Sequence, residues 1–184
     1  LSGELSDYLA IPRAQFTSLM SLFMAMHDLG KFASAFQALF SNDSSKLILP
    51  NSRKCYDGTH YRHDRLGTWF WRKLRKQICE RCTAGYGLNR RQQSYLAKPL
   101  NIIMDCMLGH HGVPVDLDEP GIEGFTESQN LTASEAFTAD LIVLFQPELT
   151  EIIYQNDTEW LAKLKQVSWH IAGMAVLCDW IGSD

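Results

Sequence analysis

Apolar residues recur every three or four positions along most of this 184-residue sequence, a spacing typical of α-helices that bury one face. The first such run extends from Pro12 to Gly30. No stretch alternates apolar and polar residues long enough to predict a sheet. The sequence therefore predicts an all-α helical bundle, with further helices over residues 64–82, 92–108, 133–145 and 158–181 and a short one from Pro147.

Two long segments, residues 41–60 and 112–130, are rich in Ser, Asn, Asp, Gly and Pro and are expected to be connecting loops. The length of the chain fits a single domain, residues 1–184, with its own core. There is no signal peptide and no apolar run long enough to span a membrane. We expect a soluble, cytoplasmic protein with no membrane partner.

The five cysteines are an odd number without the spacing of a disulfide framework, which favours a reducing compartment. Cys79 and Cys82 have the spacing of a zinc-binding pair, but no second pair accompanies them. We expect these two cysteines to lie together on a helix surface by coincidence.

Metal-ligand residues occur in three apolar, helix-like segments that are far apart in the sequence. They are His27-Asp28 in MAMHDLGKF, His110-His111 in LGHHG and Asp179 in LCDWIGSD. Imidazole and carboxylate suit Mn, Fe, Co, Ni, Zn or Mg, and such mixed sets usually leave coordination positions open for water and substrate. This pattern predicts a catalytic site for divalent metal.

Helical geometry adds detail to this site. His27 and Lys31, four residues apart, would share a face, whereas Asp28 would be turned aside by about 100° and could bridge two ions. Asp179 falls on an apolar stripe and is predicted to face the core, where a lone charge is costly unless it is paired or metal-bound. His170 falls on the opposite side of that helix and is predicted to pack or to lie on the surface.

Ordinary structural explanations remain for each piece. A His-Asp pair can simply be hydrogen-bonded, His110-His111 can end a helix, and Asp179 can bond a buried Trp or His.

Positive and negative charges are segregated along the sequence. Residues 53–91 hold eleven Lys/Arg against three acids, and residues 116–159 hold eleven Asp/Glu and no Lys or Arg, within a net charge of −4. The basic segment could hold a polyanion, or both segments could be solvated helix faces.

Four motifs taken together, HDLGKFASAFQ, YRHDRLG, LGHHG and CDWIGSD, resemble the HD nuclease domain of the CRISPR-associated helicase-nuclease of type I systems. The resemblance covers about residues 16–184. HDLGK is shared by all HD phosphohydrolases, and its combination with GHHG and DWIGS is more specific. The resemblance implies an HD-domain helical bundle with long connecting loops.

The resemblance also implies residue roles and a cofactor of one or two divalent ions (Mn, Fe, Co, Ni or Mg). Asp28 would be the bridging, catalytic ligand, Lys31 would contact the scissile phosphate, and Ser183 would assist near the site. His63 is preferred over His60 because its His-x-x-x-Gly context matches the family better. The implied metal ligands are His27, Asp28, His63, His110, His111 and Asp179.

The implied function is an endonuclease of antiviral defence that hydrolyses single-stranded DNA displaced in an R-loop. The basic segment, with Arg62, Arg72 and Lys73, would bind the strand. The implied partners are a helicase, expected after residue 184 because the chain has no GxxxxGK[ST] loop, and the RNA-guided surveillance complex (Cascade) of a prokaryotic cytoplasm.

One departure leaves two other functions open. The family has a further His upstream of its His-Asp pair, and this sequence has no His before His27, which predicts an N-terminal truncation or a weakened metal position. The alternatives are an HD nucleotide phosphohydrolase acting on a small phosphate ester and a non-catalytic HD interaction module. Metal content and competition by single-stranded DNA would distinguish the three.

Overall fold

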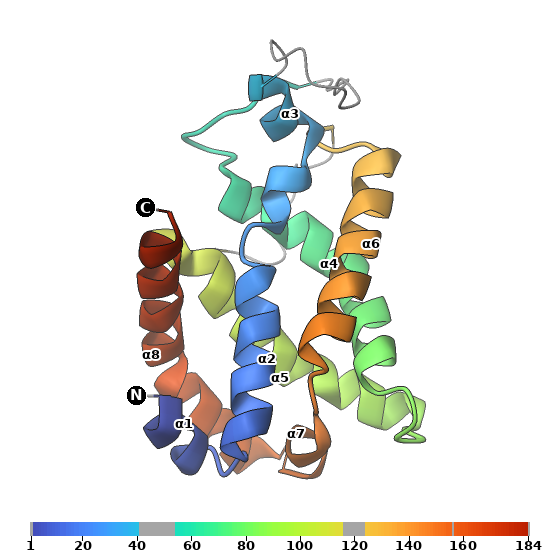
Figure 1. The fold of residues 1–184 in the computed structure, drawn as a ribbon, viewed down its shortest axis with the longest axis vertical. Coiled ribbons are helices and arrows are strands. Elements are labelled where there is room, and N and C mark those ends of the chain that lie inside the picture. The colour runs from blue at the N-terminus through green and yellow to red at the C-terminus, as the bar shows by residue number, and fades with distance from the viewer. Residues whose placement is uncertain (1, 41–53, 116–123, 156, 184) are drawn as a thin grey trace.

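The computed structural model describes residues 2–40, 54–115, 124–155 and 157–183. Within these ranges the chain forms α-helices and short 3₁₀ helices but no strand, so the all-α prediction is confirmed. The α-helices are α1 (Ser2–Tyr8), α2 (Arg13–Ala25), α3 (Ser34–Gln37), α4 (His63–Cys82), α5 (Arg90–Leu108), α6 (Ser128–Phe145), α7 (Thr150–Gln155) and α8 (Thr158–Gly182) (Figure 1). The 3₁₀ helices are η1 (Leu29–Phe32), η2 (Ala38–Phe40) and η3 (Gly109–His111).

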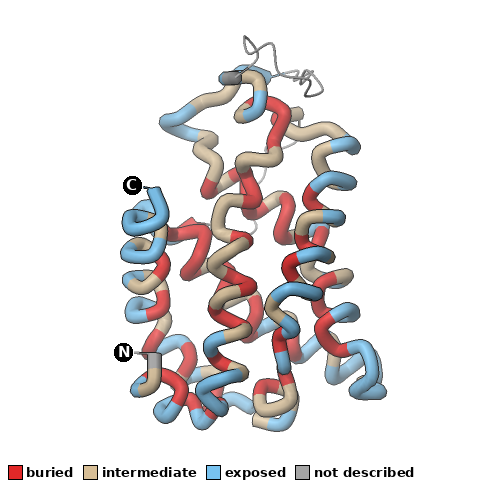
Figure 2. The backbone as a smooth tube through the Cα atoms, in the orientation of Figure 1, coloured by how far each residue is buried: buried red, intermediate tan, exposed pale blue. Residues whose placement is uncertain are grey.

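Helix α5 is central in the bundle: it contacts α4 on one side and α8 on the other, and it also contacts α2. Helix α6 packs on both α2 and α4. Their buried faces turn toward one another in Figure 2. The core is closed by large side chains, with Phe23 of α2 meeting Trp71 of α4 edge to face at 5.5 Å between ring centroids. Trp71 donates its indole N–H to Asn101 of α5, so its polar atom is satisfied inside the bundle.

The first helix is shorter than the apolar repeat predicts. The structure ends α2 at Ala25, turns through residues 26–28 and continues as η1, so His27 and Lys31 do not share a regular helical face. The apolar repeat persists across this break because Met26 and Leu29 are still buried. Apolar spacing therefore reports burial here and not an unbroken helix.

The predicted loops are found where the structure describes them. Residues 54–62 and 124–127 contain no helix, while residues 41–53 and 116–123 of the two segments lie outside the described residues. Helix α6 begins at Ser128, earlier than expected, since Glu127 and Asn130 form a capping box around its first turn. None of the described helices combines the length and apolar character needed to cross a bilayer.

The cysteine pair differs from the expectation of a surface position. Cys79 and Cys82 are buried free thiols on the inner side of α4, and burial raises their pKa values to about 11 and about 12. They act as small apolar core residues.

Trp71 lies in the core, Trp69 is half-buried, and His170 is exposed as predicted.

Two glycines allow three segments of the chain to approach closely. A Cβ added at Gly30 of η1 would overlap the carbonyl oxygen of His63 and would lie 2.7 Å from the backbone nitrogen of Gly67. A Cβ at Gly67 of α4 would lie 2.6 Å from Cδ2 of Leu108, at the end of α5. The two glycines therefore hold the turn after α2, the start of α4 and the end of α5 together.

We predict that Gly30→Ala lowers the free energy of unfolding by roughly 3–5 kcal/mol, because backbone atoms of His63 and Gly67 cannot move aside without displacing α4. Gly173→Ala in α8 is the matched control. Its added Cβ meets nothing within 4 Å, so it should raise stability by about 0.5–1 kcal/mol through helix propensity. Urea unfolding measures both, and equal stability of Gly30→Ala and wild type would contradict the close-approach account.

Candidate metal centre

The turn after α2, the first residue of α4, η3 and the last turns of α8 bring four sequence motifs to one place. His27 and Asp28 come from the turn, His63 opens α4, His110 and His111 form η3, and Asp179 comes from α8. These segments are joined by the Gly30 and Gly67 contacts and by packing of η3 against α4, α5 and α8. Side chains that are as much as 152 positions apart in sequence thus become neighbours.

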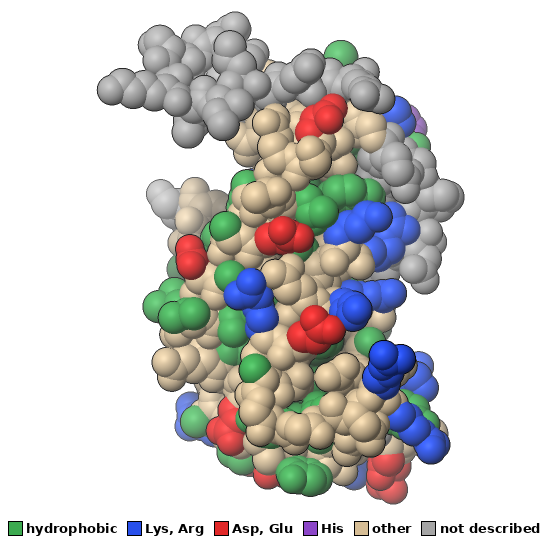
Figure 3. All heavy atoms as spheres, turned by 90° about the vertical axis from the view of Figure 1, so that its right-hand side faces the viewer, with side chains coloured by type: hydrophobic (Ala, Val, Ile, Leu, Met, Phe, Trp, Pro, Cys, Tyr) green, Lys and Arg blue, Asp and Glu red, His purple; other side chains and the backbone are tan. Residues whose placement is uncertain are grey.

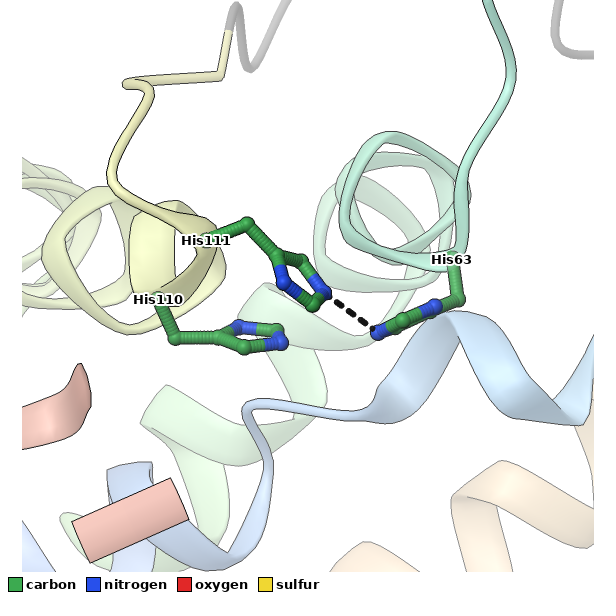
Figure 4. A group of neighbouring side chains, drawn as sticks. All are labelled: His63, His110 and His111. Carbon is green, nitrogen blue, oxygen red and sulfur yellow. Dashed lines mark hydrogen bonds between the residues drawn. The ribbon is translucent and has the colours of Figure 1, made fainter. Parts of the chain in front are cut away.

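His63, His110 and His111 form the first group of candidate ligands (Figure 4). Nε2 of His63 and Nε2 of His111 are 3.0 Å apart, and one candidate ligand atom from each of the three residues lies within 4.8 Å of the others. Two nitrogens bound at right angles to one ion at about 2.1 Å would be separated by about 3.0 Å. The spacing fits a pair of ligands to a single cation.

A second group contains His27, Asp28 and His110, so His110 belongs to both. Asp28 lies between the groups. Its Oδ2 is 3.2 Å from Nε2 of His27, and its Oδ1 is 3.3 Å from Nε2 of His63 and 3.9 Å from Nε2 of His110. The carboxylate thus has one oxygen toward each group, the placement expected of a ligand shared by two ions.

Backbone carbonyls fix the orientation of two imidazoles. Nδ1 of His27 donates to the carbonyl of Met24 at 2.6 Å, and Nδ1 of His110 donates to the carbonyl of Met107 at 3.0 Å. Nδ1 therefore carries a proton in both rings, and Nε2 is the nitrogen that faces the cluster, with its lone pair available whenever the ring is neutral. Protein metal sites use such outer hydrogen bonds to set the tautomer of a ligating histidine.

The pKa shifts of the three-histidine group favour neutral rings. Burial is the main cause that lowers the pKa of His63 to about 4, opposed by the charge of Asp28 and reinforced by His111 and His110. Burial also lowers the pKa of His110, with the charges of His111 and His27 adding to the effect. Burial lowers the pKa of His111 as well, and there the charge of Arg62 adds to it. Neutral imidazole is the form that binds metal.

The His27–Asp28 pair behaves in the opposite way. Burial alone would lower the pKa of His27, but hydrogen bonds and charge from Asp28, with the Met24 carbonyl and Asp179, raise it. Burial alone would raise the pKa of Asp28, but hydrogen bonds and charge from His27 and Lys31 hold it well below its usual range. Asp28 is therefore an ionised carboxylate that attracts cations.

The residues present fit a divalent ion. Oδ1 of Asp28 is buried and accepts no hydrogen bond from the described part of the chain, although two histidine nitrogens face it. A buried carboxylate oxygen without a donor costs free energy, and a cation would remove that cost. His63, His110, His111, His27 and Asp28 form the two groups able to hold one or two ions.

The other predicted site residues lie at the rim. Asp179 is 21% exposed rather than enclosed in the core, and its Oδ1 is 3.3 Å from Nε2 of His27. Nζ of Lys31 is 2.6 Å from Oδ2 of Asp28, with the side chain 44% exposed toward solvent. Ser183 caps α8 and donates its hydroxyl to the carbonyl of Asp179, so its described contact is to the backbone and not to the cluster.

Of the two alternative histidines, His63 is in the cluster and His60 is not. The side chain of His60 is 73% exposed and its Nδ1 pairs with Asp57 at 3.1 Å. Sequence reasoning missed two supports of His63. The Tyr56 hydroxyl accepts a hydrogen bond from the backbone N–H of His63 at 3.1 Å. The ring of Phe36 packs edge to face on the His63 imidazole, with 5.7 Å between the ring centroids. The position of Tyr56 seven residues before His63, in a loop, gave no signal of this contact.

The predicted strand-binding residues extend away from the cluster along α4. Arg62 precedes the helix, and its Nη2 lies 3.6 Å from Oδ2 of Asp64. Arg72 and Lys73 follow two to three turns later, and Nζ of Lys73 lies 5.7 Å from the ring centroid of Trp69.

An all-α bundle that gathers a cluster of His and Asp side chains has the ligand types of a metal-dependent hydrolase. The family model described as Cas3, HD domain, matches residues 1–184, and the chain belongs to this family. Membership implies a metal-dependent HD phosphohydrolase or nuclease of CRISPR systems. No curated protein and no solved structure matches the chain significantly.

We predict that His63→Ala weakens binding of Mn²⁺ by about 100-fold, because it removes a candidate ligand facing both Asp28 and His111. His60→Ala, three residues away on the exposed side, should leave the affinity unchanged. Calorimetric titration of the two variants measures this difference. Equal affinities, or a larger loss in His60→Ala, would contradict the placement of His63 among the ligands.

Proposed function

We propose that this chain is a metal-dependent endonuclease that hydrolyses single-stranded DNA in type I CRISPR interference. The observation that carries the proposal is the ionised Asp28 carboxylate, which has one oxygen toward each of two histidine groups that share His110. Two adjacent cation positions suit phosphodiester hydrolysis, in which charge develops on both the attacking and the leaving oxygen.

In this proposal His27, Asp28, His63, His110, His111 and Asp179 hold the metal. A bound divalent ion supplies an activated water and neutralises charge on the phosphate. Lys31 presents its ammonium group beside Asp28 on the solvent side, where it stabilises negative charge on the phosphate oxygens. Met24 and Met107 keep His27 and His110 in the ligating tautomer through their carbonyls.

The outer face of α4 binds the strand. Arg65, Arg72 and Lys76 are spaced seven and then four residues apart, so they share one helix face, and Lys73 lies beside them over Trp69. Figure 3, which views the side with α4 and α6, shows Lys and Arg side chains concentrated along one half of that surface. Such a row follows a phosphate backbone without reading its sequence.

The proposed setting is a prokaryotic cytoplasm, with a helicase, in the same chain or separate, that feeds the unwound strand to the site. An RNA-guided surveillance complex (Cascade) would select the target. Ser183, at the end of α8, and Arg62, before α4, are proposed to contact substrate near the scissile bond.

We predict that Asp28→Asn reduces metal-dependent cutting of circular single-stranded DNA by about 1000-fold or more, because the neutral amide neither attracts nor bridges cations. Asp57→Asn, an exposed carboxylate beside His60, is the matched control and should cut like wild type. Chelator-treated protein is assayed with Mn, Fe, Co, Ni, Zn or Mg added singly. Undiminished cutting by Asp28→Asn would contradict the site.

The same assay separates the alternatives. Hydrolysis of nucleotides that excess single-stranded DNA does not inhibit would favour a nucleotide phosphohydrolase. Protein that binds no metal and cuts nothing would favour an interaction module.

We predict that Arg72→Glu with Lys73→Glu weakens binding of single-stranded DNA by about tenfold and reduces the slope of log affinity against log salt by about 1.4. Metal affinity should not change, since both residues lie on later turns of α4 than His63. The control, Arg13→Glu with Lys163→Glu on α2 and α8, carries the same change in net charge. Equal losses in the two double variants would show that net charge, and not the α4 face, determines binding.

A further inference from the structure

A pocket that several charged and polar side chains line lies between α4 and α5, far along α4 from the metal centre. Its volume is about 630 Å³, and the α4 side is lined by Arg75, Lys76, Cys79 and Glu80. The α5 side is lined by Arg90, Gln93, Ser94 and Ala97. Nothing in the proposed chemistry of the metal centre uses this pocket.

The lining is electropositive. The lining includes three cations, Arg75, Lys76 and Arg90, and one carboxylate, Glu80. Oε1 of Glu80 is 3.9 Å from Nζ of Lys76. Burial raises the pKa of Cys79 to about 11, so its thiol adds no negative charge at neutral pH. Two positive charges remain in excess, accompanied by the amide of Gln93 and the hydroxyl of Ser94 as neutral hydrogen-bonding groups. This chemistry suits phosphate oxygens, which arginine binds with two parallel hydrogen bonds.

The pocket continues the basic face of α4. Lys76 belongs to both, because it shares the helix face of Arg65 and Arg72 and also lines the pocket. His63 and Arg75 are twelve residues apart on one helix, which corresponds to about 18 Å along its axis. At about 3.4 Å per stacked nucleotide, that distance is on the order of five nucleotides, and fewer in an extended strand.

We propose that the pocket between α4 and α5 binds backbone phosphates of the same single strand that the metal centre cuts, anchoring it a few nucleotides from the scissile bond. This inference rests on the proposed function and deepens it. An anchor at this distance makes affinity depend on strand length: an oligonucleotide that reaches the pocket binds at two points, whereas a shorter one binds at only one.

The test is fluorescence anisotropy of labelled phosphorothioate oligothymidylates from about 2 to about 12 nucleotides, with Mn²⁺ present so that the metal centre is occupied while the modified linkages resist cutting. Wild type should show a rise in affinity of about tenfold or more over a narrow range of lengths. Arg75→Glu with Arg90→Glu should remove that rise and reduce the salt slope for long strands by about 1.4. Arg75→Lys with Arg90→Lys should retain most of it.

The matched control is again Arg13→Glu with Lys163→Glu, which changes net charge equally and should retain the length-dependent rise. Loss of the rise in both charge-reversed variants, or in neither, overturns the proposal. Circular dichroism establishes that each variant is folded, and the lysine variant keeps the test valid if the glutamate variant does not fold.

A small phosphodiester separates this inference from the proposed function. Thymidine 5′-(4-nitrophenyl phosphate) does not extend beyond the metal centre, so with metal added its hydrolysis should be equal in wild type and in the pocket variants. If wild type hydrolyses it but shows no length-dependent binding, the anchor is wrong and the metal chemistry stands. If wild type shows the length dependence but hydrolyses nothing, the anchor stands and the nuclease assignment fails.

Discussion

The close approach of Gly30 to the first residue of α4 is the constraint on which the rest of the site depends. Because Gly30 carries no side chain, η1 lies directly against the His63 carbonyl. Gly67, one turn later in α4, likewise leaves room for the side chain of Leu108 at the end of α5. These contacts bring Asp28, His63 and His110 within a few ångströms of one another. A methyl group at Gly30 would push apart the very segments that carry the ligands.

The cluster contains a buried carboxylate oxygen that lacks a hydrogen-bond donor, and histidine nitrogens that could bind a cation beside it. Backbone carbonyls hold Nδ1 of His27 and of His110, so Nε2 of each ring faces the cluster, and the buried Oδ1 of Asp28 receives no hydrogen bond from the described residues. Without metal, burial of this unpaired oxygen destabilises the folded protein, and a bound divalent cation would remove the destabilisation. The arrangement is thus suited to bind metal, and in the proposed function Lys31, beside Asp28, and the basic face of α4 supply the positive charge for a phosphate backbone.

Much of the fold and part of the site follow from sequence. Apolar spacing predicts the helices from α4 onward, and the HDLGK and GHHG motifs predict which histidines meet. Spacing could not predict the end of α2 at Ala25, because the buried Met26 and Leu29 continue the repeat through a turn. It also could not predict Tyr56 behind His63, or the burial of Cys79, since both depend on packing between segments distant in sequence.

The most direct test of the account is anomalous scattering from crystals grown with Mn²⁺. We expect density for one or two ions about 2 Å from Nε2 of the clustered histidines, with Asp28 in contact with each ion. Manganese bound elsewhere, for instance between His60 and Asp57, with the His63, His110 and His111 cluster empty, would contradict the claim that these four segments form a metal centre.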